Sequence, residues 1–448
     1  MTKSLIYKSS FKEINRLAIP AMLAGIAEPL LSMADVAFVG HLPQYATESL
    51  SAVGLVGVFL SMLIWILGQT RSAISTIISQ YLGAGKLEKV KDLPAQVIYS
   101  VIALSLVIIT ITYPLAPEIF KLYNADSKLL ELSIEYYHIR VFGLPFTLIT
   151  FVIFGVFRGL QNTFYPMLIA IIGALSNVVL DYILIFGYHD FIPAMHVTGA
   201  AYASVIAQIL MAGLAIYFLY KKTPIRLRLQ RPFNAEMKNL ATMVLNLFIR
   251  TLALNIALYL GSSFATRYGK ESIAAYTIAI NIWFFFAFLI DGYSSAGNIL
   301  SGKLYGEKSY LKLKNLGNQL TRYALILGFV IAIISGIGYY PIGRLFIDDA
   351  AVLAKFYTVF WIVLLMQPIN GVAFIFDGIF KGLGWMKYLR KVLLIATFLG
   401  FVPVLLLTNY WGLELYGIWI SFTVWMIIRG WVLLNKFKHL SIFNNDKS

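Results

Sequence analysis

The sequence predicts an all-α polytopic membrane protein, with twelve transmembrane helices in two pseudo-symmetric six-helix lobes. Of its 448 residues, 59% are hydrophobic and only 13% are charged, whereas soluble domains carry about a quarter of their residues charged. Such a chain cannot cover a surface that faces water, and its mean hydropathy is +0.78. A series of long apolar runs predicts the membrane-spanning helices, and an internal repeat predicts the two lobes.

A membrane-spanning helix needs about 20 mostly apolar residues. Twelve such runs begin near residues 14, 50, 94, 130, 163, 199, 238, 272, 318, 351, 387 and 413. The fourth run is the least regular, because it carries His138 and Arg140. The first run is long enough to span, so we expect it to stay in the membrane rather than to be cleaved as a signal peptide.

Charge in the loops predicts the orientation, because loops rich in Lys and Arg remain in the cytoplasm. Basic residues precede the first run and recur in alternate loops, most densely in "YKKTPIRLRLQRPFNAEMK". The intervening loops "HLPQYAT", "YHDFIPAMHVTG" and "TNYWGLELYG" have no Lys or Arg. We therefore expect a multi-pass protein of the cell membrane with both termini cytoplasmic. The net charge of +15 then reflects topology and not a nucleic-acid partner.

Four short motifs recur at one spacing of 223 positions, which predicts a duplicated chain. The pairs are Glu48 and Glu271, Gly83 and Gly306, Pro145 and Pro368, and Arg158-Gly159-Leu160 and Lys381-Gly382-Leu383. We expect an N-lobe over 1–220 with the cation-coupling site, a basic cytoplasmic linker over 221–237 and a C-lobe over 238–448. Two lobes of six helices enter the membrane in the same orientation, with a cavity expected between them.

Acidic residues inside the apolar runs are the first candidates for function, because a charge in hydrocarbon is costly. Glu28 and Asp35 are seven positions apart in "LAIPAMLAGIAEPLLSMADVAFVG", and Asn177 and Asp181 are four apart, so each pair shares a helix face. Such carboxylates can exchange a proton or ligate Na⁺ through their oxygens. The alternatives are a structural hydrogen bond for Asp35 and Asp181, and for Glu28 a cap at the kink that Pro29 introduces.

Further polar residues extend these candidates. Tyr136 and Ser204 add a phenol and a hydroxyl to the N-lobe, and Met33 is expected to line an adaptable apolar cavity. Arg250, Asp291 and Asp377 are secondary candidates in the C-lobe. If Arg250 pairs with one of these acids, the pair is structural.

Several kinds of chemistry are excluded or unsupported. There is no cysteine, no GxxxxGK[ST] phosphate loop and no HExxH motif. His189, Asp190 and His196 cluster in one predicted external loop, where chance proximity is preferred to a metal site. We therefore expect neither an enzyme nor a metal site nor a cofactor.

These motifs in this order resemble the multidrug and toxin extrusion (MATE) family, specifically its DNA-damage-inducible F branch. The likeness covers nearly the whole chain and is strongest in "MADVAFVGHL", "GLPFTLITFVIFGVFRGLQNT", "SNVVLDYILIFG" and "VTGAAYAS". The resemblance places Asp35 at the family's first-helix acid, and Asn177 and Asp181 at its fifth-helix Asn-x-x-x-Asp. Tyr136 and Ser204 match polar positions near that cation site.

The resemblance also implies a function. Asn162, in "RGLQNT", is a further match that we expect near the substrate cavity. The expected protein is a monomeric cation-coupled antiporter that exports lipophilic, mostly cationic drugs and toxins. The acids of the C-lobe sit elsewhere than in branches that couple through that lobe, which favours H⁺ over Na⁺ as the coupling ion.

Two alternatives remain open: an Na⁺-coupled version of the same exporter, and a lipid-linked oligosaccharide flippase of a related superfamily. A flippase for anionic substrates would need several basic residues in its cavity. Outside the predicted loops we find Arg71, Arg140 and Arg250.

Overall fold

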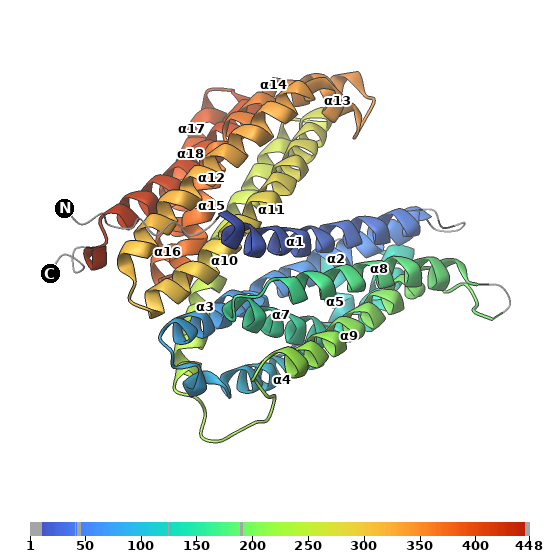
Figure 1. Ribbon diagram of the computed structural model, residues 1–448. Coiled ribbons are helices and arrows are strands. Elements are labelled where there is room, and N and C mark those ends of the chain that lie inside the picture. Colours follow the sequence, from blue (N-terminus) through green and yellow to red (C-terminus); the bar gives the residue numbers. More distant parts are fainter. Residues whose placement is uncertain (1–10, 41, 43–45, 124, 189–190, 444–448) are drawn as a thin grey trace. The chain divides into compact units, whose positions relative to one another are not determined.

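The structure is a computed structural model that describes residues 11–40, 42, 46–123, 125–188 and 191–443. Within these ranges, the side chains of residues 27–37, 40, 46 and 47 are not described. Nearly all described residues are helical, and they contain no strand beyond one isolated bridge between Tyr188 and Ile192. The ribbon in Figure 1 accordingly consists of helices and short connections.

The helices account for every predicted membrane span. Among the described residues, ten helical segments are long and apolar enough to cross a membrane, and an eleventh is a bent pair. That pair joins Ala350–Leu365 to Gln367–Gly382 at an angle of 50°. The remaining span is α1 (Phe11–Gly40), which contains the first apolar run. The predicted all-α membrane fold is confirmed.

Contacts divide the chain into two compact units. The N-terminal unit comprises Leu23–Tyr81 and Lys86–Val244. Among the described residues, the C-terminal unit comprises 11–22, Leu82–Gly85 and 245–443. The exact limits of the two lobes and of the linker between them remain a prediction.

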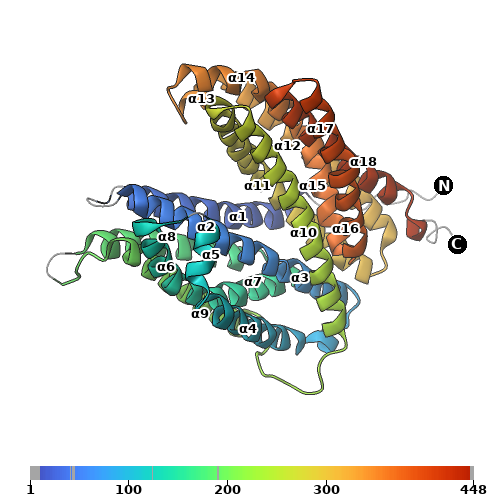
Figure 2. The same ribbon diagram turned by 180° about the vertical axis from the view of Figure 1, so that it is seen from behind.

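The N-terminal unit is a bundle in which α9 occupies a central place. Its helices after α1 are α2 (Ala46–Leu67), α3 (Thr70–Gly83), α4 (Leu93–Thr112), α5 (Ala116–Leu122), α6 (Ser127–Arg140), α7 (Leu144–Gly159), α8 (Phe164–Phe186) and α9 (His196–Lys222). Short 3₁₀ turns lie at Leu87–Val90 and Val141–Gly143. Helix α9 packs against α6, α7 and α8, and α2 packs against α6. Figures 1 and 2 show α8 and α9 side by side from both directions.

The C-terminal unit is arranged around α15. Its helices are α10 (Glu236–Arg267), most of which lies here, α11 (Lys270–Gly306), α12 (Tyr310–Ile337), α13 (Tyr339–Arg344), α14 (Ala350–Leu365), α15 (Gln367–Gly382), α16 (Met386–Ile395), α17 (Val402–Tyr410) and α18 (Glu414–Lys438). A π-helical turn, Ala396–Phe401, joins α16 to α17, and a 3₁₀ turn covers Ser441–Phe443. Helix α15 packs against α11, α12 and α18, so its polar side chains lie in the interior.

The repeated prolines mark the same structural feature in both units. Pro145 lies in the first turn of α7, and Pro368 lies in the first turn of α15. Proline removes a backbone donor and clashes with the preceding turn, so each of these spans is interrupted there. The spacing of 223 found in the sequence therefore corresponds to equivalent helix breaks.

Close contacts between helices also recur in the two units at the spacing of 223 positions. A Cβ added to Gly155 of α7 would lie 2.5 Å from the carbonyl oxygen of Arg71, and one added to Gly378 of α15 would lie 2.1 Å from that of Ser294. Arg71 and Ser294 are also 223 positions apart. Two more such contacts lie one helical turn further along. A Cβ added to Gly159 would lie close to the carbonyl oxygen of Ser75, and one added to Gly382 close to that of Asn298. Glycine is required because only its lack of a Cβ lets these backbones approach so closely.

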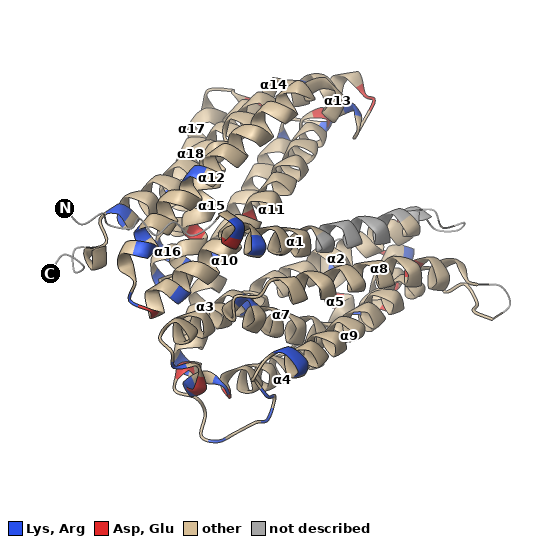
Figure 3. Cartoon of the chain, in the orientation of Figure 1, with Lys and Arg blue, Asp and Glu red and all other residues tan. Residues whose placement is uncertain are grey.

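Charged residues are sparse along the helices. In Figure 3 the middle portions of most helices are tan, and Lys and Arg gather around the segments that join α3 to α4 and α9 to α10. The few charged residues within the helices therefore stand out as candidates for function.

Candidate functional site

Asn177 and Asp181 lie on the buried face of α8. The buried residues of this helix recur every three or four positions from Pro166 to Ile185, which keeps them on one face. Asn177 is 3% exposed and Asp181 is fully buried. The amide and the carboxylate therefore lie one turn apart, facing the interior of the unit.

Helix α9 packs closely against α8. A Cβ added to Gly199 of α9 would lie 2.4 Å from the carbonyl oxygen of Leu184, and one added to Gly173 of α8 would lie 2.3 Å from the Sδ of Met211. Ser204 lies on α9 between these two points of close approach and is buried. Its hydroxyl thus belongs to the tightly packed part of the bundle.

Tyr136 lies on α6, whose buried side chains share a hydrophobic cluster with those of α8 and α9. It is buried and belongs to one hydrophobic cluster with Ile185 of α8 and Ala200 of α9. Ile185 lies one helical turn from Asp181, and Ala200 lies one turn from Ser204. The structure therefore places these polar side chains on three helices that meet at one core.

Few basic residues lie on these three helices. Helix α8 contains no Lys or Arg, and α9 contains none before Lys221. Helix α6 contributes Arg140, whose guanidinium carbon lies 6.0 Å from the centroid of the Tyr136 ring. The Nδ2 of Asn177 is buried and has no hydrogen-bond partner among the described residues. A buried donor without an acceptor is unusual, and it suits a site that receives a ligand.

The first-helix candidates cannot be placed in this geometry. Glu28, Met33 and Asp35 lie in α1, whose backbone is helical, but their side chains lie outside the described residues. Their predicted roles in coupling and in the substrate cavity remain predictions.

Asn162 lies at the opposite end of α8 from Asp181. Its Oδ1 accepts hydrogen bonds from the backbone N–H groups of Phe164 and Tyr165, at 3.0 and 3.4 Å. These bonds satisfy donors that the start of a helix leaves free. Asp181 lies 17 positions beyond Phe164, or about 25 Å along the helix. The structure therefore does not bring Asn162 together with Asp181.

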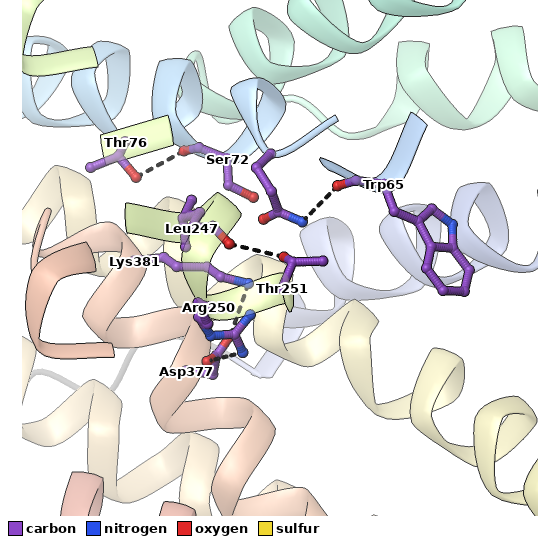
Figure 4. Close-up of polar contacts among 9 residues, drawn as sticks. Trp65, Ser72, Thr76, Leu247, Arg250, Thr251, Asp377 and Lys381 are labelled. Carbon is purple, nitrogen blue, oxygen red and sulfur yellow. Dashed lines mark hydrogen bonds and ion pairs between the residues drawn. The ribbon is translucent and has the colours of Figure 1, made fainter. Parts of the chain in front are cut away.

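The C-terminal unit contains a buried ion pair. Arg250 of α10 donates to Oδ1 of Asp377 on α15, and the two side chains are 8% and 6% exposed. The Nζ of Lys381 lies 2.8 Å from Oδ2 of the same carboxylate. Figure 4 shows both bases pointing at Asp377. Of the alternatives left open for Arg250, the structure supports pairing with an acid.

Asp291 is not part of this pair. It lies on α11 and is exposed, whereas Asp377 is buried on α15. Among the secondary candidates, the structure thus joins Arg250 to Asp377 and leaves Asp291 apart.

Three basic residues were missed by the sequence analysis, which placed only three other arginines outside the loops. Arg158 and Arg429 are buried, and the Lys381 side chain is 15% exposed. Arg158 and Lys381 lie in the last turns of α7 and α15, where a boundary error of a few residues moves them into a loop. The spacing of Asp377 and Lys381 in "DGIFK" could have identified that pair, because residues four apart on a helix are neighbours.

No group of three or more His, Cys, Asp or Glu within the described ranges is arranged to hold a metal ion. His189 and Asp190, two members of the predicted loop cluster, lie outside those ranges. The described candidate sites therefore consist of carboxylate, amide, hydroxyl, phenol and basic groups.

Comparison with known proteins identifies relatives of the whole arrangement. A family model described as MatE matches residues 20–183 and 247–406, more than half of the chain. Protein DETOXIFICATION 42 of Arabidopsis thaliana is 31% identical over 309 residues, which are 68% of this chain and 57% of that relative. The matched region thus spans just over half of the Arabidopsis protein.

Two further similarities extend over nearly the full length. DNA damage-inducible protein F of Escherichia coli (strain K12) is 26% identical over 432 residues, which are 94% of this chain and 91% of the relative. A solved outward-facing structure of a multidrug resistance MATE family transporter of the MOP superfamily has a TM-score of 0.87 at 23% identity. It covers 98% of this chain and 97% of its own.

Proposed function

The chain belongs to the MatE family of multidrug efflux transporters, and we propose that it is a proton-coupled antiporter that exports lipophilic, mostly cationic drugs and toxins across the cell membrane. The observation that supports this most is the fully buried carboxylate of Asp181, on the same face of α8 as Asn177. Ser204 lies on α9, which packs against α8, and Tyr136 lies on α6, which packs against α9.

The proposed mechanism depends on a change of charge at the N-terminal unit. An ionised carboxylate attracts a cation, whereas the protonated form does not. Binding of a cationic substrate near Asp181 therefore favours release of a proton, and binding of a proton favours release of the substrate. We expect Asp35 to share this role, and the Asn177 amide to hydrogen-bond the carboxylate or the ligand.

The proposed substrates follow from the side chains available for contact. The chain has 32 Phe, 27 Tyr and 12 Met residues, and no acid or base occurs in α8 other than Asp181. Aromatic faces attract cations, and apolar walls favour bulky hydrophobic compounds. In this proposal the protein works as a monomer, without a cofactor, and its only other partner is the lipid bilayer.

The proposed orientation places both termini in the cytoplasm, as the basic loops predict. The chain has no native cysteine, so a single cysteine introduced at Thr223 reports the side of the membrane without background. Protection from an impermeant thiol reagent in intact cells is expected. Labelling from outside would refute this orientation.

The central experiment measures protons released when substrate is added to purified protein in weakly buffered detergent solution. We expect a lipophilic cation to release protons with and without Na⁺, and Asp181→Asn to release fewer. Asp126→Asn, at an exposed position, is the matched control. Release of no protons by the wild type, with transport that requires Na⁺, would instead support the Na⁺-coupled version.

One observation favours the second candidate function, a flippase for lipid-linked oligosaccharides. Arg250, Lys381 and Arg429 place basic groups inside the C-terminal unit, where an anionic lipid-linked sugar would need them. Accumulation of lipophilic cationic dyes separates the two functions. Cells that express an exporter should retain less dye than controls, whereas a flippase should leave dye levels unchanged and move a labelled lipid-linked sugar in liposomes.

A further inference from the structure

Four charged side chains of the C-terminal unit form a group that we call the α15 charge cluster: Asp377, Lys381, Arg250 and Arg429. Arg250 and Lys381 contact the Asp377 carboxylate directly. The charges of Asp377 and Arg250 also act on Arg429, which lies on the neighbouring helix α18. The cluster thus contains three bases and one acid.

Arg429 has no ion-pair partner among the described residues. Its side chain is 2% exposed, and its guanidinium lies over the rings of Trp425 and Phe374, at 4.7 and 5.6 Å from their centroids. Its Nη1 donates to the sulfur of Met426 at 3.1 Å, which is a weak acceptor. Its Nη2 is buried and has no hydrogen-bond partner within the described part of the chain.

This arrangement leaves positive charge uncompensated in the interior. A buried charge is unfavourable unless an opposite charge or strong hydrogen bonds offset the loss of water. Asp377 is already contacted by two bases, and the positive charge of Arg250 opposes that of Arg429. An added anion would compensate Arg429 and satisfy its Nη2.

We propose that the α15 charge cluster binds an oxyanion, either a carboxylate or a phosphate group, through Arg429 and its neighbouring bases. A guanidinium presents its N–H donors in a planar fork that matches two oxygens of such a group. The rings of Trp425 and Phe374 hold the plane of that fork. This anion site is additional to the cation exchange proposed for the N-terminal unit and does not depend on it.

Lys381 provides the more accessible edge of the cluster. Its side chain is 15% exposed, against 8% for Arg250 and 6% for Asp377. It lies in the last turn of α15, which ends at Gly382. A free carboxylate or phosphate, or the phosphate of a lipid headgroup, would approach from this end of the helix.

Thermal stability of the purified full-length protein tests the proposal, because a ligand that binds only the folded state raises the melting temperature. One arm compares sodium succinate and inorganic phosphate with sodium chloride at equal ionic strength in a neutral detergent. The other arm compares phosphatidylglycerol with phosphatidylcholine. A dose-dependent rise in the first arm identifies a free anion, and a rise confined to the second identifies a lipid headgroup.

The variants assign the effect to Arg429. We expect Arg429→Gln to abolish the rise, and Arg429→Lys, which keeps the charge but loses the fork, to retain part of it. Arg228→Gln, at an exposed position between α9 and α10, should respond like the wild type. If Arg429→Gln is too unstable to purify, the Arg429→Lys result decides. The proposal is overturned if every condition gives the same melting temperature, or if a purified Arg429 variant keeps the full rise.

Discussion

Asp181 and Asp377 are both buried carboxylates on membrane-spanning helices, but the two units surround them differently. Asp377 has Arg250 and Lys381 in direct contact. Asp181 lies on a helix without Lys or Arg, and α9 beside it has no Lys or Arg before Lys221. The buried amide of Asn177 lies one turn away on the same face of α8, and the buried hydroxyl of Ser204 lies on α9.

From this difference we infer a structural role for Asp377 and an ion-exchange role for Asp181. A carboxylate with two bases in contact has permanent partners, and it fastens α10 and α15 together. Asp181 lies on a helix that carries no base, and it is the carboxylate that we propose to exchange a proton for a cation. The internal repeat sharpens the comparison, because the helix breaks and glycine contacts recur in both units whereas the two buried carboxylates do not: Val404 stands opposite Asp181, and Phe154 stands opposite Asp377.

The largest expected effect is on folding, from Asp377→Asn. The substitution leaves the buried Arg250 and the half-buried Lys381 without their counter-charge, which should lower the free energy of unfolding by about 3–5 kcal/mol. Thermal melting of the purified protein measures this loss. Replacing the pair together, as Arg250→Met with Asp377→Leu, should recover much of the stability. A single variant as stable as the wild type would contradict a structural role.

Asp181→Asn should instead fold normally and fail in transport. The amide has nearly the size of the acid but cannot change its charge, so transport driven by an imposed pH gradient in liposomes should fall about tenfold or more. Asp35→Asn should have the same phenotype. Wild-type rates from either variant, at equal reconstitution, would show that the carboxylate it removes is not the coupling group.

The repeated glycines predict a matched pair of stability losses. Gly378→Ala and Gly155→Ala each force a Cβ against a carbonyl oxygen and should cost about 1–3 kcal/mol, with the larger loss at Gly378, where the approach is closer. Gly213→Ala on α9 is the control, because its Cβ would meet nothing within 4 Å. Equal melting temperatures for all three variants would contradict the close crossings.

A smaller effect is expected from Asn162→Ala. Loss of the hydrogen bonds that the Asn162 side chain accepts from the first turn of α8 should cost about 1 kcal/mol of stability and leave the transport rate per folded molecule unchanged. Reduced transport at unchanged stability would favour the role in the substrate cavity that the family resemblance implies.

The smallest effect is expected from Asp126→Asn. This side chain is exposed, and although Asp126 precedes α6 it makes no capping hydrogen bond. Both the melting temperature and transport should match those of the wild type. A loss of transport here would remove the distinction between buried and exposed acids on which the comparison depends.

Much of the fold could be predicted from the sequence because its signals are local. The length and hydropathy of each run indicate a span, and the spacing of Asn177 and Asp181 indicates a shared face. Proline positions in the repeat correspond to the breaks before α7 and α15. Each of these features depends on residues within a few turns of one helix, where helix geometry alone sets the outcome.

Only the tertiary structure decided which charged residues are partners. Arg250 and Asp377 are 127 positions apart, and Arg429 lies on a third helix. No periodicity relates them, because their approach depends on how α10, α15 and α18 pack. Sequence spacing could identify the polar face of α8, but the hydrophobic packing that joins it to α6 and α9 comes from residues far apart in the chain. Helix periodicity is a property of short segments, whereas compensation of a buried charge is a property of the assembled bundle.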